Sequence, residues 1–98
     1  MTRIDFDWDP TKAATNRAKH GVAFEEAMLV FDDPLALSLR DDDHSLDEER
    51  WITLGATAAD RLVVVVHTFR ESSDGEILVR IISARRPTRR ETRQYVEG

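Results

Sequence analysis

Cysteine is absent from this chain of 98 residues. That absence excludes disulfide bridges, thiolate metal sites and catalysis by a cysteine nucleophile. The three prolines and four glycines form neither a glycine-rich phosphate loop nor a Gly-x-Ser-x-Gly turn, so nucleotide hydrolases and serine hydrolases have no support. The three histidines lack metal-ligand spacing, and the aspartate-rich stretch lacks the glycine and regular placement of a calcium loop. We therefore expect no metal and no cofactor.

Long apolar runs are absent too. No window approaches the roughly 20 apolar residues of a membrane span, and the N-terminal sequence reaches charged residues at once, unlike a signal peptide. An apolar content of 41% over residues 1–98 suits one small domain with a single core. These features predict a soluble protein of the cytoplasm.

Arginine is concentrated in the last fifth of the chain. From Val79 to Gly98 there are six arginines and two glutamates, which give this segment a charge of +4. Because the net charge of the whole chain is −5, residues 1–78 carry a charge of −9. Such segregation predicts a basic end that attracts phosphates and an acidic end that meets a basic partner. A solvated, arginine-rich helix would give the same charge count.

The start of the chain predicts a strand and a helix. From Ile4 to Trp8 apolar residues alternate with aspartates, which predicts an edge strand with one buried and one acidic face. Asp9 before Pro10 is the pairing expected where an aspartate caps a helix whose first residue is proline. That helix should run through Lys19 and stop at Gly21, because glycine is a natural left-handed terminator.

A second helix is predicted from Phe24 up to Pro34, with apolar residues three and four apart on one face. A short strand over 35–39 and an acidic loop over 41–49 should follow. Three segments dense in Val, Ile and Thr then predict strands, and the unbroken apolar run of the middle one predicts a position inside the sheet. These strands are Trp51 to Thr57, Leu62 to Phe69 and Ile77 to Ala84.

The closing segment predicts a last helix from Thr88 to Glu97, because Thr88 and Glu91 have the spacing of a capping box. The predicted order is an N-terminal strand, two helices, an antiparallel four-strand meander and a C-terminal helix. This is an α+β domain with helices packed on an antiparallel sheet.

Arg80 is out of place in its predicted strand. Strict alternation puts it on one face with Ala84, and puts Ser83 and Arg85 on the other. A guanidinium among aliphatic side chains costs several kcal/mol to desolvate unless it is paired or opens onto a cleft. Two interpretations stay open, an internal salt bridge with a carboxylate such as Glu49 and a phosphate ligand in a groove across the sheet.

Other polar residues also have two explanations. His67, at the end of the apolar run, is either a satisfied polar residue or an acid–base group. Glu49 and Arg50 place opposite charges at the mouth of a strand, where they either reach a cleft or neutralise each other. Lys19 lies at the carboxyl end of the first predicted helix, where the helix dipole favours positive charge.

A series of short motifs in this chain resembles the BrnT-type toxins, a branch of the RelE-like ribonuclease toxins of bacterial toxin–antitoxin pairs. The motifs span nearly the whole length in the right order. They are FDWDP, N-x-x-KHG ending at Gly21, FEEA, FDDP, EERW, LVVVVHT and RIISARRPTRRE. The resemblance implies a compact RelE-like fold and RNA cleavage without a metal.

The resemblance also implies a partner. The expected antitoxin is of the BrnA type, with a ribbon-helix-helix DNA-binding part. The heteromeric complex, expected to be a heterotetramer, would repress its own promoter, so DNA would be contacted only through the antitoxin.

Site residues follow from the same resemblance. The candidate catalytic positions are Arg50, His67, Arg80, Arg85 and Glu91. The candidate RNA-binding positions are Lys19, Ser83, Arg86 and Arg89. One departure concerns the last helix, where many members have arginine directly after the glutamate but Thr92 follows Glu91 here. A one-residue shift turns a helical side chain by about 100°, so Arg93 need not replace the missing arginine.

A physical mechanism can be stated without the family. Metal-free RNA cleavage needs the 2′-hydroxyl deprotonated, the phosphorane charge balanced and the leaving 5′-oxygen protonated. Arginine suits the second need, because its planar fork matches two phosphate oxygens. We hypothesise that Arg80 and Arg85 hold the scissile phosphate while Glu49 or His67 serves as base or acid.

Two other functions stay open from the sequence. One is a non-catalytic module that binds a protein partner and assists DNA repression. The other is a small RNA-binding protein that contacts phosphates and cuts nothing.

Overall fold

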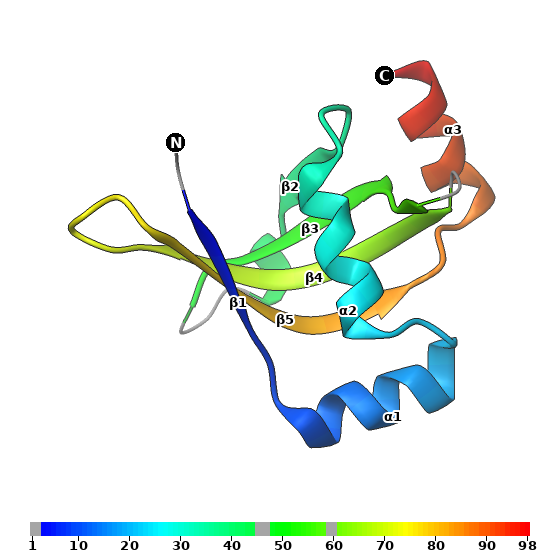
Figure 1. Cartoon of the computed structure of the whole chain (residues 1–98). Helices are drawn as coiled ribbons and strands as arrows, with labels where there is room; N and C mark the ends of the chain where they lie inside the picture. Colours follow the sequence, from blue (N-terminus) through cyan, green and yellow to red (C-terminus); the bar gives the residue numbers. More distant parts are fainter. Residues whose placement is uncertain (1–2, 45–47, 59–60) are drawn as a thin grey trace.

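The computed structural model describes residues 3–44, 48–58 and 61–98 as an α+β fold on a five-stranded sheet with strand order β1-β5-β4-β3-β2 (Figure 1). The strands are β1 (Ile4–Asp7), β2 (Leu37–Arg40), β3 (Arg50–Ala56), β4 (Leu62–Glu71) and β5 (Ile77–Arg85). The helices are α1 (Pro10–His20), α2 (Phe24–Ala27) and α3 (Arg89–Glu97), with 3-10 helices η1 (Met28–Asp32) and η2 (Asp42–His44). Within these described ranges, no helix is long and apolar enough to cross a bilayer.

The predicted antiparallel meander is confirmed, and it runs through β2, β3, β4 and β5. β4 is the central strand, as its apolar run predicts, and Val63, Val64 and Val65 are all buried. β1 is an edge strand, as predicted, but it pairs in parallel with β5. Local alternation could not indicate that partner, because the pairing joins the two ends of the chain.

The predicted boundaries of α1 are confirmed. Asp9 Oδ1 accepts hydrogen bonds from the backbone N–H groups of Thr11 at 2.8 Å and Lys12 at 3.4 Å, and Pro10 is the first helical residue. Gly21 ends the helix with φ of 72°. Glycine adopts this left-handed conformation without the cost that a side chain would impose.

The prediction of one continuous helix from Phe24 to Pro34 is wrong. The α-helical turn ends at Ala27, and the 3-10 helix η1 carries the chain to Asp32. The carboxylate of Asp33 accepts from the backbone N–H of Leu35 at 2.9 Å and from that of Ala56 at 2.8 Å. These bonds turn the chain out of the helix and tie it to β3.

The next strand starts later than predicted, at Leu37 instead of Leu35, because Leu35 belongs to the turn that Asp33 holds. The stretch predicted as an acidic loop contains η2, and its residues 45–47 lie outside the described ranges. The segment between β3 and β4 includes residues 59–60, which also lie outside the described ranges.

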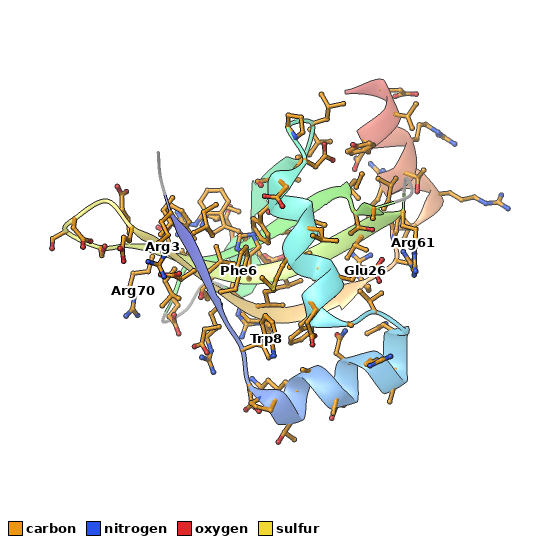
Figure 2. All side chains as sticks on the ribbon, viewed as in Figure 1. Arg3, Phe6, Trp8, Glu26, Arg61 and Arg70 are labelled. Carbon is orange, nitrogen blue, oxygen red and sulfur yellow. The ribbon has the colours of Figure 1, made fainter. Side chains whose placement is uncertain are left out.

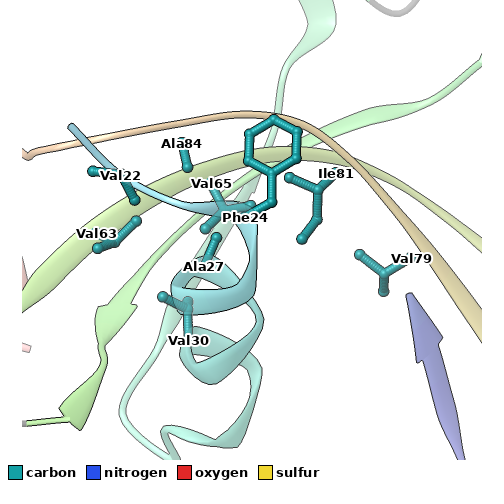
Figure 3. Close-up of a cluster of buried hydrophobic side chains, with 9 residues drawn as sticks. All are labelled: Val22, Phe24, Ala27, Val30, Val63, Val65, Val79, Ile81 and Ala84. Atoms are coloured by element: carbon teal, nitrogen blue, oxygen red, sulfur yellow. The ribbon is translucent and has the colours of Figure 1, made fainter. Parts of the chain in front are cut away.

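One buried hydrophobic cluster lies between the first helices and the sheet (Figure 3). Its members are Val22, Phe24, Ala27, Val30, Val63, Val65, Val79, Ile81 and Ala84. Phe6 and Trp8 extend from the β1 segment and pack against it (Figure 2). The ring centroids of Phe6 and Phe31 are 5.4 Å apart, and those of Trp8 and Phe24 are 5.8 Å apart in an edge-on contact. We call the sheet side that carries this cluster the helix face.

A β-bulge interrupts the pairing of β4 with β5. His67 opposes Ile81, but the preceding residue, Val66, opposes Ser83. Ile82 is therefore an extra residue, and the alternation of side chains changes phase there.

Because of the bulge, the predicted orientation of the Ala84 side chain is wrong. Ala84 was expected on the face of Arg80, but it is fully buried in the cluster with Ile81, on the helix face. Ser83 and Arg85 accordingly share the opposite face with Arg80. The extra residue depends on the register with β4, so β5 alone does not reveal it.

Asn16 joins α1 to the end of β5. Its side-chain nitrogen donates to the carbonyl oxygens of Val22 at 3.2 Å and Ala84 at 2.8 Å, and its Oδ1 accepts from the Ala84 N–H at 3.1 Å. The residue is only 7% exposed, so water cannot readily replace these bonds.

Replacing Asn16 by alanine should lower the free energy of unfolding by about 2 to 4 kcal/mol, because buried backbone groups lose their partners. Urea unfolding at pH 7 measures the loss. Thr15→Ala, at an exposed position of the same helix, is the matched control and should change the value by less than about 0.5 kcal/mol. A loss below about 1 kcal/mol for Asn16→Ala would contradict this account of α1.

Candidate functional site

The sheet side opposite the helix face carries four of the predicted site residues, namely Arg50, Arg80, Ser83 and Arg85. Alternation along β4 directs Thr68 and Arg70 to this side and His67 to the helix face. Thr68 opposes Arg50 on β3 and Arg80 on β5. We call this surface the arginine face. It comprises Arg50, Thr68, Arg70, Arg80, Ser83 and Arg85.

Arg80 forms an ion pair across the sheet edge with Asp7 of β1. The salt bridge considered from the sequence therefore exists, but its partner is Asp7 and not Glu49. Both side chains are about half exposed, at 46% and 51%. A pair so exposed is worth at most about 1 kcal/mol, so an incoming phosphate can compete with Asp7 for the guanidinium.

A cleft of about 290 Å³ opens beside this pair. Its lining residues are Asp7, Glu48, Thr68, Arg70, Leu78 and Arg80. Glu48 thus reaches the cleft, whereas Glu49 lies 3.6 Å from Arg40 Nη1 in an exposed ion pair. Arg70 lies toward the β4–β5 hairpin, at the end of the sheet away from α3 (Figure 2).

Arg85 and Glu91 are brought together as a two-fold hydrogen-bonded pair, with Nη1–Oε1 at 2.8 Å and Nη2–Oε2 at 2.9 Å. The predicted capping box positions Glu91 and is confirmed. Thr88 Oγ1 accepts from the Glu91 N–H at 3.2 Å, and Glu91 Oε1 accepts from the Thr88 N–H at 2.8 Å. The Arg85 hydrogen bonds are the main cause that lowers the pKa of the Glu91 carboxyl to about 2.

The Arg80 and Arg85 pairs occupy different parts of the arginine face. Arg85 opposes Val64, while Arg80 opposes Thr68 on the same strand, and these β4 positions are about 13 Å apart along the strand. The Arg80 guanidinium points to β1 and that of Arg85 points to α3. The arrangement suits two phosphates of one strand better than a single phosphate.

His67 is not brought to the arginine face. It is 5% exposed on the helix face, and its ring lies 4.8 Å from that of Phe31 in an edge-on contact. Burial lowers the pKa of the imidazole, which favours the neutral form. Nδ1 is 3.2 Å from the Thr68 carbonyl oxygen, so Nδ1 carries the proton and Nε2 accepts from the Thr53 hydroxyl at 2.7 Å.

The predicted RNA-binding residues are scattered. Lys19 is exposed at the end of α1, on the helix-face side, and Arg89 is exposed at the start of α3. Ser83 lies on the arginine face between the two arginine pairs. Arg86 Nη1 donates to the Leu62 carbonyl oxygen at 3.2 Å, which gives Arg86 a role in holding the chain end.

The last helix explains the departure noted at Thr92. The Thr92 hydroxyl donates to the Thr88 carbonyl oxygen at 3.0 Å, so it supports the helix start. Arg93 is exposed, and the Arg85–Glu91 pair forms without it.

Four polar residues that line the cleft escaped sequence reasoning, namely Asp7, Glu48, Thr68 and Arg70. Thr68 and Arg70 have a usable signal, since they alternate with His67, but their neighbours become known only with the β4–β5 register. In the described part of the chain, no group of three or more His, Asp or Glu side chains is placed to hold a metal ion.

Replacing Glu91 by glutamine should destabilise the fold by about 1 to 2 kcal/mol at pH 7, after allowance for solvent screening of the pair. The pKa of Glu91 is lowered in the folded state from 4.5 to about 2. Its contribution is therefore complete above pH 4.5 and disappears as the pH falls through 2. Urea unfolding of both proteins between pH 7 and pH 2 should show the difference shrinking. Glu97→Gln on the same helix is the control, and a difference independent of pH would refute the assignment.

Comparison with known proteins points to one family. The family model of the ribonuclease toxin BrnT, of type II toxin–antitoxin systems, matches residues 8–91. A similar solved structure is the 1.1 Å crystal structure of the Brucella abortus ribonuclease toxin BrnT, with 26% identity and a TM-score of 0.58, covering 91% of this chain and 99% of that one. Curated proteins include no match. The chain therefore belongs to the BrnT family of ribonuclease toxins.

Proposed function

We propose that this chain is a metal-independent endoribonuclease that inhibits translation, with the arginine face as its RNA-binding surface. The observation that carries the proposal is the common orientation of Arg50, Arg80 and Arg85 on one sheet face, which arises from the registers of β4 with β3 and with β5. Membership of a ribonuclease toxin family supports RNA as the substrate.

The chemistry that we propose is centred on the cleft at Thr68. Arg80 exchanges Asp7 for the scissile phosphate, while Arg85 holds a neighbouring phosphate of the same strand. Their fixed positive charges balance the extra negative charge of the phosphorane. The Glu48 carboxylate takes the proton of the 2′-hydroxyl. The 2′-oxygen then attacks phosphorus, the bond to the 5′-oxygen breaks, and water supplies the proton to that leaving oxygen.

Glu48 replaces both acid–base candidates taken from the sequence. His67 faces the opposite side of the sheet, where Phe31 and Thr53 surround it. Glu49 contacts Arg40 outside the cleft. Under this proposal His67 positions the Thr68 backbone through its hydrogen bond.

We also propose a cytoplasmic complex with a BrnA-type antitoxin, as a heterotetramer that represses its own promoter and contacts DNA through the antitoxin alone. The family supports an antitoxin partner in general. The net charge of −5 and the exposed acids Asp42 and Asp43 favour a basic partner segment and repel nucleic acid from that part of the surface.

Arg80→Ala and Arg85→Ala should each lower kcat/KM for RNA cleavage by about 100-fold, near 3 kcal/mol, the loss expected for one preorganised donor. Cleavage of a labelled RNA in EDTA measures it, and the parent should cut equally well with and without the chelator. Arg17→Ala on α1 is the matched control. Salt-sensitive RNA binding by the parent without cleavage would favour the non-catalytic alternative.

Glu48→Gln and Glu49→Gln form a second matched pair of neighbouring, isosteric changes. Loss of the general base should cost Glu48→Gln about 100-fold or more in kcat, while Glu49→Gln should retain activity within a few-fold. The same RNA assay, repeated across pH, checks both. If Glu49→Gln is instead the inactive protein, the assignment made from the sequence is right and the present one is wrong.

A further inference from the structure

Among residues 3–44, 48–58 and 61–98, no strand pairs with the outer edge of β2. β2 is the terminal strand of the sheet order, and its inner edge pairs with β3. The N–H of Asp41 donates to the Arg50 carbonyl oxygen at 2.8 Å, which makes that a hydrogen-bonded pair of the ladder. Bonded and non-bonded pairs alternate in antiparallel strands. Ser38 and Arg40 therefore turn their backbone N–H and C=O groups away from β3, toward the open edge.

Large apolar side chains accompany this edge. Leu35 is 69% exposed and Leu39 is 71% exposed. An apolar edge strand with free backbone groups is a template for pairing with another chain, and proteins usually cover or charge such edges. Exposed leucines beside an open edge are therefore typical of an interface.

Two cavities, one on each side of the sheet, meet at Ser38, which lines both. The helix-face cavity has a volume of about 300 Å³ and is walled by aromatic rings, including Phe31 and Trp51. The other has a volume of about 470 Å³ and lies between the sheet and α3, with Leu39 and Val64 in its lining. Successive side chains of a strand point to opposite faces, so a strand added to β2 would direct alternate residues toward the two cavities.

We propose that the β2 edge binds an extended segment of a protein partner, which continues the sheet and inserts apolar side chains into both cavities. The basic residues of that segment would lie beside the acids that follow β2. In identifying the partner as the antitoxin, this inference rests on the proposed function. Backbone pairing supplies affinity in such complexes, and the pockets for alternate side chains supply specificity.

Charge selects this occupant over the alternatives. Asp41, Asp42 and Asp43 follow β2 directly. Arg40 forms ion pairs with Asp42 at 3.2 Å and Glu49 at 3.6 Å at the same end, so the acids there outnumber this arginine. A basic segment is attracted to this end, whereas RNA is repelled. Two copies of the chain, each at −5, repel each other.

The test uses the full chain, labelled with 15N, and a synthetic peptide, acetyl-KKVTVIV-amide. In an antiparallel arrangement its lysines lie beside the acids after β2. We expect saturable NMR shifts at β2 and in both cavities, and at least tenfold slower hydrogen exchange at the amides of Ser38 and Arg40. The peptide with glutamates in place of lysines should bind at least tenfold more weakly.

Variants distinguish specific peptide binding at the β2 edge from nonspecific apolar association. Leu39→Lys should weaken peptide binding at least tenfold, because it sets a positive charge against the lysines of the peptide. Leu29→Lys is the matched control, since Leu29 is 41% exposed on η1 and lines neither cavity, and it should bind like the parent. Ser38→Pro removes the outward N–H at a position where edge strands tolerate proline, and it should abolish binding while the amide shifts of β4 persist.

Three results would overturn the proposal. They are no saturable shift at millimolar peptide, shifts confined to the arginine face, and concentration-dependent shifts of the chain alone, which would assign the edge to a second copy. RNA cleavage measured on the same proteins separates the two claims. Peptide binding without cleavage leaves the docking edge standing and refutes the ribonuclease, whereas cleavage without peptide binding does the reverse.

Discussion

The pairing register between β4 and β5 is the constraint on which the proposed RNA-binding surface depends. With unbroken alternation, Arg80 and Arg85 would lie on opposite faces of β5, and no single strand of RNA could contact both. The extra residue at Ile82 changes the phase of the strand, so that both guanidinium groups share one face while Ala84 enters the core. A single backbone irregularity thus serves packing on one side and charge placement on the other.

Arg80 and Arg85 each form an ion pair with a carboxylate of the same chain. Asp7 pairs with Arg80 in an exposed, weak contact, and Glu91 pairs with Arg85 through two hydrogen bonds in a less exposed one. The two pairs therefore differ in how easily a phosphate replaces the carboxylate, because the Glu91 contact is also fixed by the capping box. In the proposed role, Arg80 is the more available phosphate ligand, and Arg85 is the more rigid one.

Local signals allowed much of the fold to be predicted from the sequence, because caps and strand periodicity depend on neighbouring residues. Asp9, Gly21 and Thr88 set helix ends by contacts within a few residues, and each was predicted correctly. The change to a 3-10 helix after Ala27 and the bulge at Ile82 were not predicted, and the bulge depends on the register with β4. The prediction of the candidate site was less accurate for this reason. His67 and Arg80 are both polar residues in apolar strand segments, yet their side chains lie on opposite faces of the sheet.

Because β4 is the central strand, its alternating side chains separate core packing on the helix face from polar contacts on the arginine face. The odd-numbered residues Val63, Val65 and His67 face the helices. The neutral imidazole of His67 costs little to bury there, because both of its ring nitrogens are hydrogen-bonded. The even-numbered residues Thr68 and Arg70 line the cleft on the arginine face, where Thr68 is 9% exposed and Arg70 is exposed. A change at Val63, Val65 or His67 therefore acts first on packing, while a change at Thr68 or Arg70 acts first on the contacts within the cleft. This separation explains how an acidic protein can hold a basic surface, since the arginines need no place in the core.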